Sequence, residues 1–220
     1  INYRANIFAL KSLGVTQIIG ISAVGSLRED IAPGDLAIPN QYFDWTRGRR
    51  AATFFGEGIA AHVSTATPVS AQLVHWIERH ARALDMRLHA NVTYACVEGP
   101  RLGTRAESHF LRQAGCHLVG MTNVPEVFLA CEAQICYATI AIATDYDCWL
   151  EDPSKHVTAT SIFTLYRQSL LTAQALLASL CSDALPPEEP EIRTALAYAL
   201  LTTEEAISDT QKRWLEVLQR

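Results

Sequence analysis

Two aspartates separated by one residue, Asp145 and Asp147, are the side chains in this sequence best suited to acid–base chemistry. They follow an apolar run at residues 135–144 that has the composition of a buried strand. In an extended segment, residues two apart project to the same side, so both carboxylates would face one cleft. Crowded carboxylates do not both ionise cheaply, and one of them would then hold a proton near neutral pH. The same pair could instead form an Asp-rich turn before the next helix.

Two hydroxyl side chains, Ser22 and Thr122, also stand where strand-like segments end. Small residues accompany them, in Ser22-Ala23-Val24-Gly25 and Met121-Thr122-Asn123. In an open α/β sheet, ligands bind beyond the carboxyl ends of the strands, where backbone N–H groups are free. Ser22 and Thr122 could therefore donate hydrogen bonds to a phosphate, or they could be ordinary polar residues at strand ends. Of the seven histidines, only His62 lies in a loop from which it could reach a ligand or a neighbouring subunit.

The elements that must position these side chains alternate between helical and strand-like patterns along the whole chain. Helices are predicted over residues 2–13, 70–84, 104–115 and 158–180, and a further helix is predicted to begin after Asn123 as its N-cap. Strands are predicted over residues 17–22, 35–42, 92–97, 118–121 and 135–144. Thr104 and Glu107 have the spacing of a capping box, and Thr202 with Glu205 repeats that spacing. The alternation predicts an α/β fold of three layers, α/β/α, around a central mixed sheet.

The domain organisation is expected to be simple. With 220 residues, 49% of them hydrophobic, the chain can bury a full core without a disulfide or a metal staple. The predicted domain covers residues 1–182 and is followed by a linker rich in proline and glutamate at 183–190. The helical residues 191–220 would dock on the same domain or on a neighbour.

The charge of the chain argues against two classes of partner. Lys and Arg number 18 against 23 Asp and Glu, and only residues 47–50 gather positive charge, which we interpret as a solvated turn. No basic face is therefore expected for nucleic acid. The most apolar run, residues 135–144, falls well short of the roughly 20 residues that span a bilayer as a helix, so no membrane partner is expected either.

The six cysteines show neither a C-x-x-C pair nor a regular spacing to histidine. They are interpreted as buried free thiols, and neither a metal site nor an organic cofactor is expected. No secretion signal is recognisable in the sequence. These features favour a reducing compartment, the cytoplasm.

Several stretches of the sequence together resemble the methylthioadenosine phosphorylases of the trimeric purine nucleoside phosphorylase family. They are INYRAN at 1–6, GSLRE at 25–29, PGD at 33–35, EGPR at 98–101, RAES at 105–108, MTNVPE at 121–126 and ATDYDCW at 143–149. The resemblance implies a nucleoside phosphorylase-like fold and a homotrimer. It also implies phosphorolysis, in which inorganic phosphate attacks the anomeric carbon of 5′-methylthioadenosine or a related 6-aminopurine nucleoside. Adenine would leave, and methylthioribose 1-phosphate would remain.

The resemblance also implies roles for individual residues. Asp145 would serve N7 of the leaving purine, and Asp147 would help to select a 6-amino group. The phosphate would be bound by Ser22, Ala23 and Thr122. The nucleoside would contact both aspartates, Met121 against the ribose, His62 from a neighbouring subunit at the 5′ end, and Val24, Gly25, Leu102, Gly103, Val119 and Ile162.

Three departures from the family pattern leave a second interpretation open. Ahead of the position that matches Ile1, members of the family carry a strand with a Gly-rich phosphate loop and an Arg–His pair, so the matched part of the sheet is expected to lack these. Leu102 stands where the family usually offers an aromatic ring to the purine, and Gly103 where relatives bond the base. The alternative function is a catalytically impaired relative that binds a planar aromatic small molecule.

Overall fold

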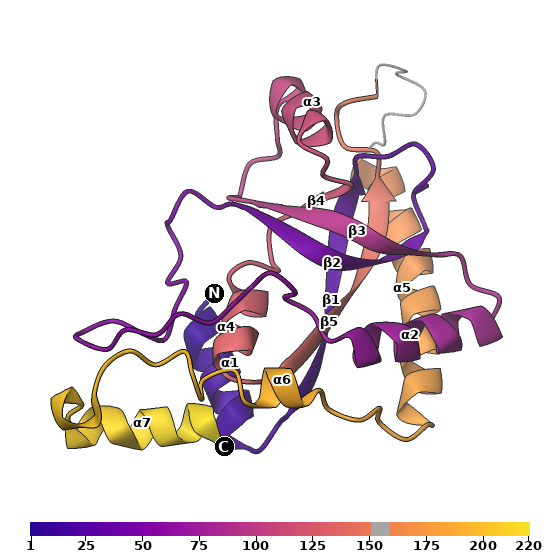
Figure 1. Cartoon of the computed structure of the whole chain (residues 1–220). Coiled ribbons are helices and arrows are strands. Elements are labelled where there is room, and N and C mark those ends of the chain that lie inside the picture. Colours follow the sequence, from indigo (N-terminus) through magenta and orange to yellow (C-terminus); the bar gives the residue numbers. More distant parts are fainter. Residues whose placement is uncertain (151–158) are drawn as a thin grey trace.

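Five strands and the helices between them form the body of the molecule in the computed structural model, which describes residues 1–150 and 159–220, with side chains at 1–150 and 169–220 (Figure 1). The strands are β1 (Gln17–Ser26), β2 (Leu36–Trp45), β3 (Leu88–Val97), β4 (Leu118–Gly120) and β5 (Cys136–Asp145). The helices are α1 (Tyr3–Ser12), α2 (Ala71–Ala83), α3 (Arg105–Gln113), α4 (Glu126–Glu132), α5 (Ala159–Cys181), α6 (Pro190–Arg193), the short 3-10 turn η2 (Glu204–Ala206) and α7 (Asp209–Gln219). The alternating elements confirm the predicted α/β fold.

The sheet is mixed and closes on itself in the order β1-β4-β3-β2-β5. β1 runs parallel to β5 and β2 runs parallel to β3, whereas β1 is antiparallel to β4 and β2 is antiparallel to β5. The sequence pattern predicted the strands and the mixed sheet but not this closure, because closure depends on how strongly the strands twist and tilt against one another.

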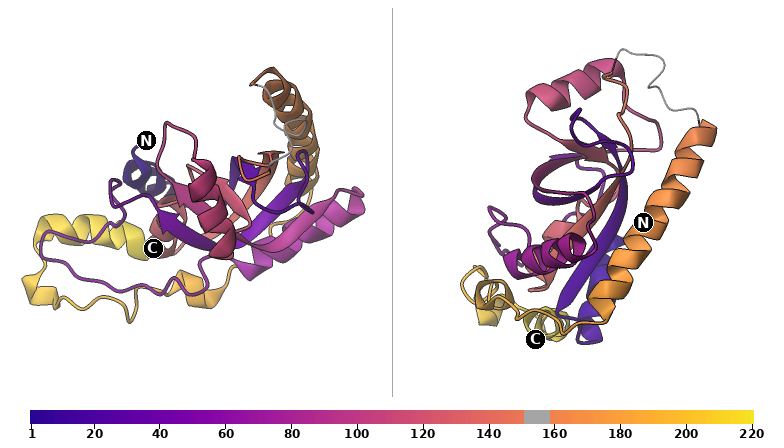
Figure 2. Two further views of the ribbon diagram at one scale, coloured as in Figure 1. Left: turned by 90° about the horizontal axis from the view of Figure 1, so that it is seen from above. Right: turned by 90° about the vertical axis from the view of Figure 1, so that its right-hand side faces the viewer.

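Helices pack on both sides of β5, the strand at the centre of the core (Figures 1 and 2). α2 and α5 contact β5 and each other. α4 contacts both β5 and α1. Every residue of β5 before Asp145 is buried. A strand that is covered on both faces reads as a continuous apolar run, which is why residues 135–144 stood out in the sequence.

The C-terminal residues dock on their own chain. Leu196, Leu215 and Leu218 are buried in the main apolar core, and α7 packs against α1. The tail also runs beside the excursion of residues 46–70, where Ala61 forms an isolated β-bridge with Leu200 (Figure 2).

The capping box predicted at the start of α3 is confirmed, and the one predicted at Thr202 is wrong. Thr104 and Glu107 form the expected capping box. Thr202 caps no helix; its hydroxyl accepts a hydrogen bond from the Ala60 N–H at 2.8 Å. The capping box near the C-terminus starts α7 instead, through Ser208 with Gln211 three residues on.

Asn123 does not cap α4, contrary to the sequence prediction. Its side chain is buried and donates to the Tyr137 hydroxyl at 3.3 Å and to the Thr139 hydroxyl. Pro125 occupies the N-cap position without a side-chain hydrogen bond. A buried amide must find partners in the core, and this requirement outweighs the local capping preference.

All six cysteines are free, and Cys96, Cys116 and Cys136 are buried. Cys181 is exposed, against the prediction of buried thiols, because it ends α5 beyond the last core residue of that helix, Leu180. Among the residues described, no helix is both long enough and apolar enough to cross a membrane.

Candidate active site

Gly25 brings predicted site residues together at the end of β1. It pairs with Asp145 of β5 and with Val119 of β4. An irregularity in the β1–β5 pairing sets Val24 opposite Ala143 but Gly25 opposite Asp145, so one residue of β5 is skipped. Such bulges re-aim side chains near functional sites. A Cβ atom at Gly25 would lie only 3.1 Å from Val119 Cγ1 and 3.2 Å from Asp145 Oδ1, so this close approach favours glycine.

The Asp145 carboxylate is mostly buried and is held by two hydrogen bonds. Oδ2 accepts from the Thr144 hydroxyl at 2.8 Å, and Oδ1 accepts from the backbone N–H of Asp147 at 2.7 Å. Burial raises the pKa of Asp145 and outweighs both hydrogen bonds, while the charge of Asp147 adds a smaller upward push. The predicted direction is confirmed, but burial rather than the neighbouring carboxylate is the main cause.

The backbone at Asp147 is not extended. Its φ of +51° lies in the left-handed region, which Asp tolerates better than most residues. The hydrogen bond from its N–H back to Asp145 closes an Asx turn. The prediction that two carboxylates project from one side of an extended segment is therefore wrong, and the turn that was the alternative is present. Asp147 nevertheless lines a cavity, together with Gly103 and Val119.

Ser22 and Thr122 meet across the sheet, with Ser22 Oγ 2.9 Å from Thr122 Oγ1. The buried Tyr94 hydroxyl lies 3.2 Å from Ser22 Oγ and accepts from the Thr122 N–H at 3.4 Å. Ser22 is buried and Thr122 is exposed, so the cluster is anchored inside and opens outward. The two hydroxyls thus form one cluster, which their sequence positions alone did not establish.

Two cavities lie on either side of the segment that follows β3, and Arg49, Glu98 and Gly99 line both. The first, of about 290 Å³, holds Gly103, Val119 and Asp147 in its wall. The second, of about 780 Å³, holds Met121 and Thr122. The first suits a flat ring, whereas the hydroxyl-bearing second cavity suits an anion and a sugar.

The remaining predicted site residues lie as follows. On β1, Val24 is buried and Ala23 is exposed. Leu102 is 78% exposed and lines neither cavity. His62 is exposed in the 46–70 excursion and also lines neither cavity. The side chain of Ile162 lies outside the described residues.

Arg50 is not part of a solvated turn, contrary to the prediction for residues 47–50. Its side chain is 12% exposed and binds both carboxylate oxygens of Glu98, at 3.1 and 3.2 Å. The same guanidinium donates to the Tyr3 hydroxyl at 3.3 Å and to the carbonyl of Val124. Arg50 also lowers the pKa of Glu98. Nothing in the sequence distinguishes Arg50 from its exposed neighbour Arg49, because the difference arises from the segments that surround it.

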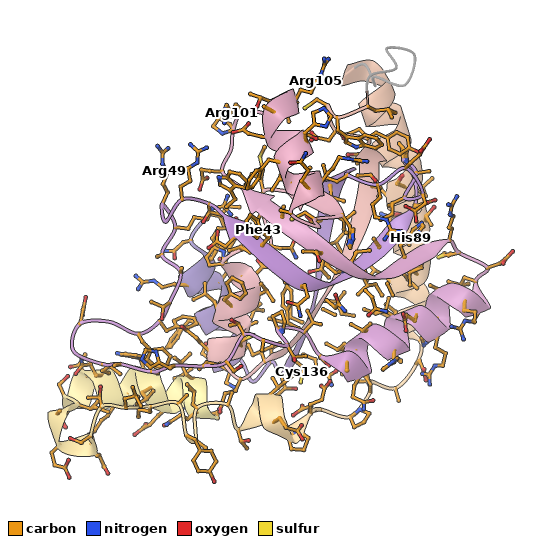
Figure 3. All side chains as sticks on the ribbon, turned by 45° about the horizontal axis from the view of Figure 1, so that its top comes forward. Phe43, Arg49, His89, Arg101, Arg105 and Cys136 are labelled. Carbon is orange, nitrogen blue, oxygen red and sulfur yellow. The ribbon has the colours of Figure 1, made fainter. Side chains whose placement is uncertain are left out.

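Charged residues from two loops border the first cavity. Figure 3 shows Arg49 and Arg101 on the side of the molecule where α3 begins. Arg101 donates two hydrogen bonds to Glu107, at 2.8 and 2.6 Å, and lowers the pKa of that carboxyl to about 2. Trp45, Ser108 and Leu111 also line this cavity, and no signal in the sequence indicated a role for them.

Comparison with known proteins identifies the family. Residues 1–181 match the phosphorylase superfamily. The chain belongs to this superfamily. It is 43% identical over 218 residues to the S-methyl-5'-thioadenosine phosphorylase of Geobacter sulfurreducens, a match that covers 99% of this chain and 76% of that protein. It is 50% identical over 203 residues to the enzyme of the same name from Hyperthermus butylicus, covering 92% and 72%.

Solved members of the phosphorylase superfamily share the fold. A methylthioadenosine phosphorylase from an antarctic soil metagenomic library has a TM-score of 0.90 at 42% identity, covering 98% of this chain and 76% of that one. The methylthioadenosine phosphorylase of Schistosoma mansoni in complex with adenine has a TM-score of 0.83 at 31% identity, covering 91% and 78%. The nucleoside phosphorylase-like fold predicted from the sequence stretches is confirmed.

Proposed function

We propose that this member of the phosphorylase superfamily cleaves 5′-methylthioadenosine with inorganic phosphate, releasing adenine and methylthioribose 1-phosphate. The names of its relatives support the substrate, and a related structure holds adenine. An oxygen of phosphate forms a bond to C1′ as the C1′–N9 bond breaks, and that electron pair leaves with the purine. Phosphate is the co-substrate, and the scheme needs no cofactor.

The observation that carries the proposal is the position of Asp145 beside Gly25, whose neighbour on the other side, Val119, lines the first cavity. A mostly buried carboxyl with a raised pKa suits a group that offers a proton or a hydrogen bond to N7 as the purine accepts electrons. We assign the adenine ring to the first cavity, against Val119 and Gly103. Asp147, in the wall of that cavity, is then the acceptor for the 6-amino group.

The phosphate is assigned to the cluster of Ser22 and Thr122, with the backbone of Ala23. Phosphorolysis passes through an oxocarbenium-like transition state, which an anion held beneath the sugar stabilises. Hydroxyl groups 2.9 Å apart can donate to two oxygens of one phosphate. Met121 lines the same cavity as Thr122, where the ribose would lie above the anion.

We further propose that the active enzyme is a homotrimer in which His62 completes the site of an adjacent subunit. His62 is exposed on the excursion of residues 46–70. Its backbone N–H donates to the Ala199 carbonyl of the C-terminal tail at 2.9 Å. It lines neither cavity of its own chain. Sedimentation should therefore give the mass of three chains, and His62→Ala should raise KM for the nucleoside while that mass is unchanged.

The experiment that tests the function is adenine release from 5′-methylthioadenosine by the purified chain, with and without phosphate. The free state of all six cysteines supports a cytoplasmic location, so a thiol reductant belongs in the buffer. Release that requires phosphate supports the proposal. Adenine that binds without any release of product from the nucleoside would favour the alternative, a relative that binds a planar aromatic molecule without turnover.

A further inference from the structure

The first cavity continues past the residues assigned to the adenine ring. Gly103, Val119 and Asp147 form one part of its wall. Trp45 at the end of β2 and Ser108 and Leu111 of α3 also line it. Because Asp147 is assigned to the 6-amino group, the space beyond it is the space that a substituent on that amino group would enter.

Ser108 is a buried polar group in this wall that lacks a partner. It is 1% exposed, and its Oγ forms no well-aligned hydrogen bond with the described residues. A helical serine ordinarily turns its hydroxyl to solvent or back to the carbonyl one turn earlier. The Thr104 carbonyl accepts only the Ser108 backbone N–H, at 3.0 Å. A buried hydroxyl without a partner costs free energy, and a ligand hydroxyl would remove that cost.

The nearby Cys148 thiol does not take the place of such a ligand. Burial and the charge of Asp147 raise the pKa of the Cys148 thiol, and the nearby Ser108 hydroxyl opposes this shift. A thiol is also a weak hydrogen-bonding group. The Ser108 hydroxyl therefore remains available to a stronger partner in the cavity.

Apolar side chains, Leu111 and Trp45, line the cavity together with Ser108, and charged side chains such as Arg49 and Arg101 line it as well. Leu111 is 2% exposed. The Trp45 ring packs edge-on against Phe110, with centroids 4.6 Å apart, and against Phe43 at 5.8 Å. Two or three methylene groups could pass between these side chains with favourable burial, and a terminal hydroxyl would then face Ser108.

We propose that this cavity binds a short hydroxyalkyl substituent on the 6-amino group of the purine, and that Ser108 hydrogen-bonds its hydroxyl. The inference rests on the proposed function, because that function places the 6-amino group at Asp147. A singly substituted 6-amino group keeps one N–H for Asp147, whereas a doubly substituted group keeps none. The substrate class is thus 6-(hydroxyalkylamino)purine nucleosides alongside the unsubstituted nucleoside.

The test measures equilibrium binding of free bases to the full chain by calorimetry, with cleavage of 5′-methylthioadenosine assayed in parallel. The bases are adenine, N6-(2-hydroxyethyl)adenine, the equally long N6-propyladenine, and N6,N6-dimethyladenine. The hydroxyethyl base should bind about tenfold tighter than the propyl base, which corresponds to one hydrogen bond. The dimethyl base should bind more weakly than adenine because Asp147 loses its donor.

Ser108→Ala should bring the ratio between the hydroxyethyl and propyl bases close to one. Ser12→Ala, which removes an exposed hydroxyl at the end of α1, is the matched control and should keep the ratio. A ratio that is unchanged in Ser108→Ala overturns the proposal. So does binding of both substituted bases at least tenfold weaker than adenine in the unmodified chain, and so does failure of every base to bind.

The parallel assay separates this inference from the proposed function. If 5′-methylthioadenosine is cleaved but the Ser108-dependent ratio is absent, the function stands and the substituent site is wrong. If the ratio is present but no phosphate-dependent cleavage occurs, the proposed function is wrong and the cavity remains a binding site for substituted purines.

Discussion

Ser22 and Thr122, one hundred residues apart in the sequence, hold their hydroxyl oxygens 2.9 Å apart. The buried Tyr94 hydroxyl contacts both residues and anchors the pair from beneath. Neither hydroxyl would be held in place by its own segment of the chain alone. The pair therefore acts as a unit in the site that we assign to phosphate.

Replacing Thr122 by Ala should raise KM for phosphate by about tenfold or more, because a hydrogen bond to a charged group is lost. Initial rates at varied phosphate and saturating nucleoside measure this effect. Thr122→Ser keeps the hydroxyl and is the matched control, with KM close to that of the unmodified chain. A KM that Thr122→Ala leaves unchanged would remove this hydroxyl from the phosphate site.

Replacing Asp145 by Asn should lower kcat by about 100-fold, the contribution expected of a positioned acid. The amide oxygen can still accept from the Asp147 N–H, and the amide NH2 can donate to the Thr144 hydroxyl, so the turn should survive. Single-turnover cleavage of 5′-methylthioadenosine separates this step from product release. Turnover equal to that of the unmodified chain would exclude Asp145 from the reaction.

The same substitution should change how stability depends on pH. A carboxyl whose pKa is raised by folding binds its proton more tightly in the folded state. Its stabilising contribution is complete below its unfolded pKa, near about 4, and is lost as pH rises through the higher folded value. The Tm of the Asp145→Asn variant, relative to that of the unmodified chain, should therefore rise between about pH 4 and pH 7. A difference that is constant with pH would contradict a raised pKa.

An added methyl group at Gly25 should disturb both carboxylates without unfolding the chain. Its Cβ would lie 3.2 Å from Asp145 Oδ1 and 3.3 Å from Asp147 Cβ, closer than such contacts normally are. We expect Gly25→Ala to lower kcat/KM by about tenfold or more, since a small misplacement of catalytic groups is costly. Far-UV circular dichroism should be unchanged. Full activity in this variant would mean that Asp145 can move away without loss of function.

Substitutions of Arg50 and of its neighbour Arg49 form a matched pair for measuring the free energy of unfolding. Arg50→Met leaves the Glu98 carboxylate and the Val124 carbonyl without their guanidinium partner and should cost about 2 kcal/mol of unfolding free energy. Arg49→Met, at an exposed neighbour, should stay within about 0.5 kcal/mol. Urea unfolding measures both values. Equal effects of the two substitutions would show that the contacts of Arg50 do not stabilise the fold.

The elements and the candidate residues were accessible from the sequence because their signals are local. The apolar run at residues 135–144 predicted β5, and the spacing of Thr104 and Glu107 predicted the start of α3. Asp145 was found as a carboxylate at the end of that strand. Each of these signals lies within one segment, so it can be read without knowledge of the rest of the chain.

Tertiary structure alone decided which residues meet and which are buried. The skipped residue in β5 that sets Asp145 beside Gly25 depends on pairing between strands more than a hundred residues apart. The burial of Arg50 and the unpaired hydroxyl of Ser108 depend in the same way on several segments packing together. Strand register and burial are properties of contacts between distant segments, and the residue types of one segment do not encode them.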